Sequence, residues 1–217
     1  MRSATKCSRR RRVLDEGATT IVRKKLDATI KVRKEREMQD DRIEYKQLIN
    51  HRLEENWKSF NLLFNMKHYG NCISILCQEL DQMISILFVL NRNEYERNHL
   101  INLSANSHRW YFLDENNKKI YIVEKDLIAY ADSLQGWEKS IYEFGLSFQK
   151  LSINFNYLLK DPIKGMSEIE RKQISEYIQE YHDKSFPDTF GIQELVPLLE
   201  KIFTSITRRI GSYLDKI

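Results

Sequence analysis

Glycine, proline and cysteine are all scarce in this chain, and each shortage excludes a class of protein. Seven glycines and three prolines among 217 residues are too few for a turn-rich β architecture and favour long helices. The glycines form neither of the GxGxxG and GxxxxGK[ST] patterns that cradle phosphates. The three cysteines include no CxxC pair, and such a sparse, odd set is typical of a reducing cytosol. We therefore expect a cytoplasmic protein.

Metal-ligand clusters and long apolar runs are also missing. The five histidines are scattered, and none stands at ligand spacing from another histidine or a cysteine, so the sequence predicts no metal site and no cofactor. The longest apolar run, Ile86–Leu90, is too short to cross a bilayer, and we expect no membrane span. The basic first residues lack the apolar core of a secretory signal, although their composition would also suit an organelle transit peptide.

The charge of the chain is divided by position. Residues 1–37 hold 13 Lys/Arg against 5 Asp/Glu, whereas the other 180 residues hold 22 against 26. This division predicts a basic arm over 1–40 and a mildly acidic domain over 41–217, and an arm of this kind attracts polyanions. We expect Met1–Arg12 to be disordered when free and residues 20–37 to form a basic helix.

The arm supplies the candidate nucleic-acid contacts. Phosphate groups are bound mainly by Lys and Arg, and the predicted contacts are Arg9, Arg10, Arg11, Arg12, Arg23, Lys24, Lys25, Lys31, Arg33 and Lys34. Two other interpretations stay open at this point. The basic helix would also suit packing against its own body or a partner chain, and it would suit a membrane surface.

The body shows helical periodicity almost throughout, with one exception. Aromatic and β-branched runs at 110–113 and 120–123 flank a polar turn, which predicts a β-hairpin. Apolar residues elsewhere recur every three or four positions, and Ser167 with Glu170 forms a capping box. The sequence therefore predicts an all-α fold, a bundle of about six helices with a small hairpin insertion near 110–123; the predicted helices cover 43–66, 72–90, 94–104, 124–134, 136–158, 167–184 and 192–216.

The helix predicted at 72–90 is the most apolar of the set, but it carries a regular polar stripe. Its polar residues recur at intervals of three or four and are Ser74, Gln78, Asp81, Gln82 and Ser85. We expect a central helix with one narrow hydrated face. Glu79 and Asp81 stand two positions apart, so their side chains diverge by about 200° and cannot share a proton. We interpret both carboxylates as polar anchors.

One pair of residues fits a catalytic role. Arg92 stands at the end of the apolar helix and His99 lies seven residues further on. A histidine acts as general acid or base on an RNA 2′-hydroxyl, and an arginine offsets charge on the phosphorane, without a metal. The alternative interpretation is an ordinary charged loop between two helices.

These features resemble the HEPN superfamily of RNA-cleaving toxins and phage abortive-infection proteins. The resemblance covers residues 43–217 and rests on the helical bundle, the helix Asn71–Ile84 and the motif R-x(4–6)-H, which Arg92 and His99 match in spacing. A second position, residues 150–157, has Phe155 in place of the motif's histidine. There the resemblance implies RNA contacts by Lys150, Asn154 and Tyr157. It also implies a homodimer.

Two hypotheses about function follow. The first is a HEPN-like RNA-directed effector of the toxin or phage-defence type, with metal-independent endoribonuclease activity by Arg92 and His99 if it is an enzyme at all. The second is a non-catalytic helical module for protein binding or dimerisation, whose arm contacts RNA, DNA or an acidic partner.

Overall fold

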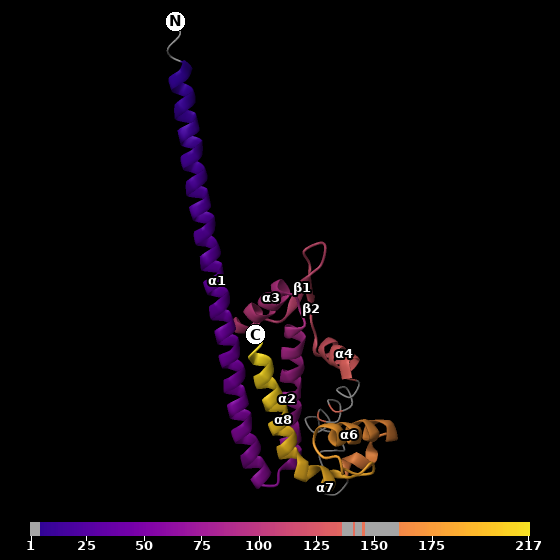
Figure 1. Cartoon of the computed structure of the whole chain (residues 1–217). Helices are drawn as coiled ribbons and strands as arrows, with labels where there is room; N and C mark the ends of the chain where they lie inside the picture. The colour runs from indigo at the N-terminus through magenta and orange to yellow at the C-terminus, as the bar shows by residue number, and fades with distance from the viewer. Residues whose placement is uncertain (1–4, 136–140, 142–144, 146–160) are drawn as a thin grey trace.

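Figure 1 shows the computed structural model of the chain, which is an all-α bundle with a small two-stranded antiparallel hairpin. The structure describes residues 5–135, 141, 145 and 161–217, without the side chains of residues 5–30, 34, 135 and 162. The fold class predicted from the sequence is thereby confirmed. Most of the helix predicted at 136–158 lies outside the described residues.

The first helix, α1, runs without a break from Thr5 to Asn65. The arm and the first helix of the body are therefore one element, and the helix starts within the segment expected to be disordered. The change near residue 40 is a change in packing: the described side chains of residues 31–40 are exposed apart from half-buried Met38, whereas Tyr45 and Ile49 are buried. In Figure 1 the indigo end of α1 extends well beyond the rest of the molecule.

The helix α2, Tyr69–Leu90, is the centre of the bundle and contacts α1, α3, α4 and α8. Thirteen of its residues are buried, while the five polar residues of its predicted hydrated stripe are all half-buried. That expectation is confirmed. By length and composition alone α2 is apolar enough to cross a membrane, and 61% of its most apolar window is buried inside the bundle.

The hairpin follows the short helix α3, Glu94–Ala105. Strand β1, Tyr111–Leu113, pairs with β2, Lys119–Tyr121, with Phe112 opposite Ile120. A carboxylate closes the turn, because Oδ1 of Asp114 accepts hydrogen bonds from the backbone N–H groups of Asn116 and Lys118, both at 2.8 Å. The helix α4, Glu124–Gln135, then packs against α2.

The C-terminal part confirms one local prediction and corrects another. Ser167 and Glu170 form the predicted capping box at the start of α6, Glu168–Tyr181, which follows the 3₁₀ turn Pro162–Gly165. The prediction of a single helix at 192–216 is wrong. The segment is divided at Pro197, which has no backbone N–H to donate. The segment instead comprises α7, Ile192–Leu195, a 3₁₀ turn, Val196–Leu198, and α8, Leu199–Leu214.

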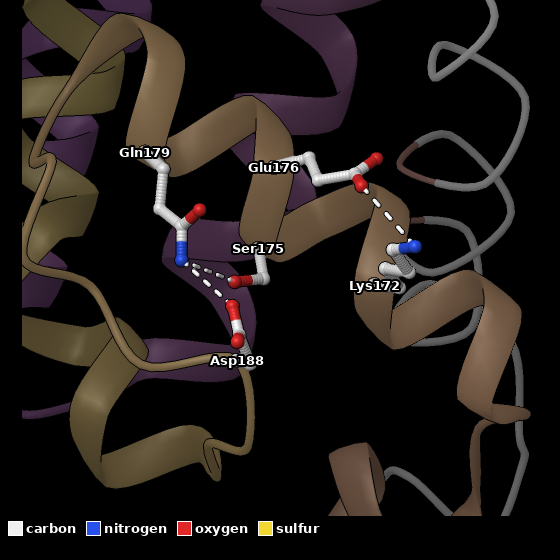
Figure 2. A network of polar contacts seen from close by, with 5 residues as sticks. All are labelled: Lys172, Ser175, Glu176, Gln179 and Asp188. Carbon is white, nitrogen blue, oxygen red and sulfur yellow. Dashed lines mark hydrogen bonds and ion pairs between the residues drawn. The ribbon is translucent and has the colours of Figure 1, made fainter.

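A polar network joins α6 to the loop that leads to α7 (Figure 2). Nε2 of Gln179 donates hydrogen bonds to the backbone oxygen of Phe186 at 2.7 Å and to Oδ1 of Asp188 at 2.9 Å. Oγ of Ser175 donates to the backbone oxygen of Pro187 at 3.1 Å. These bonds satisfy loop carbonyls that lie against the bundle, so the network has a structural role.

Candidate nucleic-acid interface and the Arg92–His99 region

The described part of the arm balances some of its own charge. Nζ of Lys31 lies 3.9 Å from a carboxylate oxygen of Glu35, and Nε of Arg33 lies 2.8 Å from one of Glu37. All four side chains are largely exposed, and such pairs on a helix contribute only a few tenths of a kcal/mol. Residues 31–37 hold four Lys/Arg against two Glu, so this segment keeps a net positive charge.

Most of the predicted phosphate-binding residues lie closer to the N-terminal end. Their backbone belongs to α1, and their side chains lie outside the described part of the structure; they are Arg9, Arg10, Arg11, Arg12, Arg23, Lys24, Lys25 and Lys34. A continuous helix spreads these positions around its axis, because successive residues are rotated by about 100°. The positive charge of the arm is therefore not confined to one face.

The base of the arm is fixed to the body by residues that the sequence analysis did not single out. Nη2 of Arg42 donates a hydrogen bond to Oδ1 of Asn98 at 2.7 Å, and Nη1 donates to the backbone oxygen of Ile217 at 3.3 Å. Nδ2 of Asn102 donates to Oδ2 of Asp41 at 2.8 Å. These contacts join positions at least 56 residues apart, so no local sequence signal identifies them.

The guanidinium group of Arg92 lies among aromatic rings. Its Cζ is 4.0 Å from the centroid of the Phe88 ring and 5.7 Å from those of Phe112 and Tyr130. Its Nε is buried and has no hydrogen-bond partner among the residues that the structure describes. Cation–π contacts of this kind hold α2, β1 and α4 together. Phosphate binds the N–H edge of a guanidinium rather than its faces, so these ring contacts position Arg92 without themselves excluding a phosphate.

The imidazole of His99 is held by the first strand of the hairpin. Its Nε2 lies 3.0 Å from the backbone oxygen of Tyr111, and its ring meets the Tyr111 ring edge-to-face with centroids 5.1 Å apart. A carbonyl oxygen only accepts hydrogen bonds, so Nε2 must carry the hydrogen and donate it. Only Nδ1 of the neutral ring is then able to accept a proton from a substrate.

The two predicted catalytic residues contact different sides of β1. Arg92 lies near Phe112 and His99 lies against Tyr111, and successive side chains of a strand point to opposite faces. Each residue thus has its own structural contacts with the hairpin. Lys150, Asn154 and Tyr157, at the second motif position, lie outside the described residues. Within the described part, no three His, Cys, Asp or Glu side chains gather as a metal ion requires.

The chain matches no protein-family model, and no curated protein or solved structure is significantly similar to it. The HEPN resemblance, the RNA target and the homodimer accordingly stay predictions.

Proposed function

We propose that this protein is a nucleic-acid-directed helical module that binds phosphates through the N-terminal half of α1. One observation carries the proposal: the basic arm is the first part of an unbroken 61-residue helix that leaves the body, and its described side chains at residues 31–37 are exposed. A helix with an excess of Lys and Arg and no apolar contact to bury is suited to a polyanion.

The dimensions of the arm suit a nucleic acid. Residues 5–40 form about 54 Å of helix at 1.5 Å per residue, which is the length of about one and a half turns of duplex DNA. The major groove of duplex DNA is wide enough for a helix, and a strand of RNA is able to follow the same charges. The contacts of Arg42 and Asp41 with α3 and the C-terminal residue fix the direction in which the arm leaves the body.

The geometry around Arg92 and His99 favours binding over cleavage. Arg92 lies near Phe112 and His99 against Tyr111, and these two residues point to opposite faces of β1, so the two groups do not converge on one substrate. We therefore favour the non-catalytic form of the proposal, in which the arm recruits nucleic acid and the bundle is its support. The HEPN-like ribonuclease is the competing proposal, and the RNA-integrity measurement in the Discussion separates the two.

The test is a salt titration of binding to labelled single-stranded RNA, duplex RNA and duplex DNA. If about six phosphates are neutralised, the association constant falls by about 10³ between about 50 and 200 mM salt. Replacing Arg9, Arg10, Arg11 and Arg12 together by Ala should reduce the slope of log K against log[salt] by about three to four.

A matched control removes the same charge from the body. Lys58, Lys118, Lys125 and Lys164 are all exposed there, and changing these four to Ala should leave the slope unchanged. A salt-independent affinity, or equal losses in the two variants, would show that the arm is not the nucleic-acid interface.

A further inference from the structure

A polar pocket lies where α1, α2 and the start of the hairpin meet. Its volume is about 330 Å³, within the lower range of small-molecule sites. Residues 45–52 of α1 and the polar stripe of α2 form most of the wall, and Ser104 and Trp110 complete it. The lining residues are Tyr45, Leu48, Ile49, Arg52, Asp81, Gln82, Ser85, Ser104 and Trp110.

Three polar side chains of this pocket have no hydrogen-bond partner among the residues that the structure describes. The phenol oxygen of Tyr45 is buried and makes no hydrogen bond with any described residue. The side chains of Gln82 and Ser85, both half-buried on the central helix, also make no hydrogen bond with a described residue. Buried polar groups in a protein are normally hydrogen-bonded, because burying them without a partner costs free energy. Water reaches the half-buried Gln82 and Ser85, so the buried phenol oxygen of Tyr45 is the group whose missing partner indicates a polar ligand in this pocket.

The pocket contains both charge signs and a rigid aromatic wall. Burial, and secondarily the charge of Glu124, raises the pKa of Asp81, while the nearby Arg52 acts in the opposite direction. Nε1 of Trp110 donates a hydrogen bond to Oγ of Ser104 at 2.8 Å, and the indole stacks on Phe88 with centroids 6.2 Å apart. The indole is thus fixed in place, and Leu48 and Ile49 add aliphatic surface.

We propose that this pocket binds a guanine base, with Asp81 accepting from the N–H donors of the base and Arg52 donating to its acceptors. Guanine presents a carbonyl oxygen and a ring nitrogen to an arginine fork, and its neighbouring edge carries only N–H donors. Adenine presents a ring-nitrogen acceptor on that second edge, which an ionised carboxylate repels. Gln82 and Ser85 are left to bind the sugar, and the aliphatic and aromatic walls contact the flat base.

The base has two possible sources with the same chemistry. One is a free guanine nucleoside or nucleotide, and the other is a base of a strand held by the arm. The second source rests on the nucleic-acid binding proposed above; the first does not. The helix α1 contains the arm and also lines the pocket. Arg52 in the pocket lies about 20 Å along this helix from residue 37, the end of the basic segment.

The experiment measures binding of guanosine and adenosine to the full chain by calorimetry at about pH 8, where carboxylates are ionised. Guanosine should bind at least about tenfold more tightly than adenosine, the loss expected for one mispaired edge. Asp81→Asn should remove that preference. Ser85→Leu should abolish binding of both nucleosides by filling the cavity, whereas Gln78→Leu, on the same stripe of α2 but outside the pocket, should change neither.

Oligonucleotides then identify the source of the base. A G-containing RNA that binds more tightly than a U-only RNA of equal length, with the difference lost in Asp81→Asn, assigns the pocket to a bound strand. Equal affinity for the two RNAs, with guanosine still preferred to adenosine, assigns the pocket to a free ligand. If neither form of guanine is preferred, the inference is overturned, and the salt titration still decides the function of the arm separately.

Discussion

Nδ2 of Asn56 on α1 donates a hydrogen bond to Oε1 of Glu79 on α2, and Glu79 is fully buried. The other carboxylate oxygen of Glu79 is also buried, with no hydrogen-bond partner among the described residues. Burial raises the pKa of Glu79, and the bond from Asn56 and the charge of Arg52 partly oppose that rise. Among the described residues, the buried carboxylate of Glu79 therefore depends on one amide donor.

Asn56→Ala should lower the free energy of unfolding by about 2 kcal/mol at neutral pH, because it leaves a buried carboxylate without its donor. A carboxyl with a raised pKa in the folded state destabilises the fold as pH rises above its ordinary value near 4.3. The loss should thus be smaller at about pH 5, where Glu79 is more often protonated. Urea unfolding at the two pH values checks this, with exposed Asn50→Ala as control; equal losses at both pH values would contradict it.

Arg42 is expected to stabilise the fold without binding nucleic acid. Its guanidinium is engaged by Asn98 and the backbone oxygen of Ile217, so Arg42→Ala should lower the free energy of unfolding by about 2 kcal/mol. The exposed Arg36 is expected to contribute to nucleic-acid binding and not to stability. Arg36→Ala should leave stability within about 0.5 kcal/mol and reduce the salt slope of binding by about one. A change of slope in Arg42→Ala alone would place the interface at the base of the arm.

The regular elements were predictable because their signals are local. Periodicity identified α2, α3, α4 and α6, and the capping box at Ser167 marked the start of α6 to the residue. The break at Pro197 could also have been predicted, since a proline inside a helical pattern removes a hydrogen bond. The continuous apolar face of 192–216 led instead to the prediction of one helix. The hydrated stripe of α2 was recognised from the spacing of its polar residues.

The candidate sites were much less predictable. The pocket joins Tyr45, Arg52 and Asp81 with Trp110, residues from separate elements whose meeting depends on how α1, α2 and the hairpin pack. The spacing of Arg92 and His99 suggested a pair, yet the hairpin that separates their contacts lies further along the chain. Sequence spacing gives positions on one helix, whereas a site between elements requires the tertiary fold.

His182 should make the protein sensitive to acid. Burial, with the charges of Arg209 and Lys201, lowers the pKa of His182 to about 4. The unfolded chain therefore binds the proton more readily, and stability is lost as pH falls from about 6.5 towards 4. His182→Gln should remove about 2 kcal/mol of that loss relative to the unchanged protein. Chemical denaturation at about pH 7 and 4.5 measures it, and exposed His51→Gln should follow the unchanged protein.

RNA should stay intact when it is incubated with the protein and a chelator, because Arg92 and His99 contact successive residues of β1, which point to opposite faces of the strand, and so do not face one phosphate. We expect His99→Ala to lower the free energy of unfolding by about 1–2 kcal/mol through the lost hydrogen bond and ring contact. Denaturing gels follow the RNA, and urea unfolding follows the fold. Cleavage by the unchanged protein that disappears in His99→Ala would instead support the ribonuclease proposal.

Ser107 ends α3 in a conformation that glycine adopts more easily. Its φ of 55° is left-handed, and two reversed bonds close the helix, from His108 N–H to the Leu103 oxygen and from Ser107 N–H to the Ser104 oxygen. Ser107→Gly should therefore raise the free energy of unfolding by about 0.5–1 kcal/mol. Ser107→Ala keeps the strain and should give no gain. Equal stability of the two variants in urea unfolding would show that α3 does not need this left-handed end.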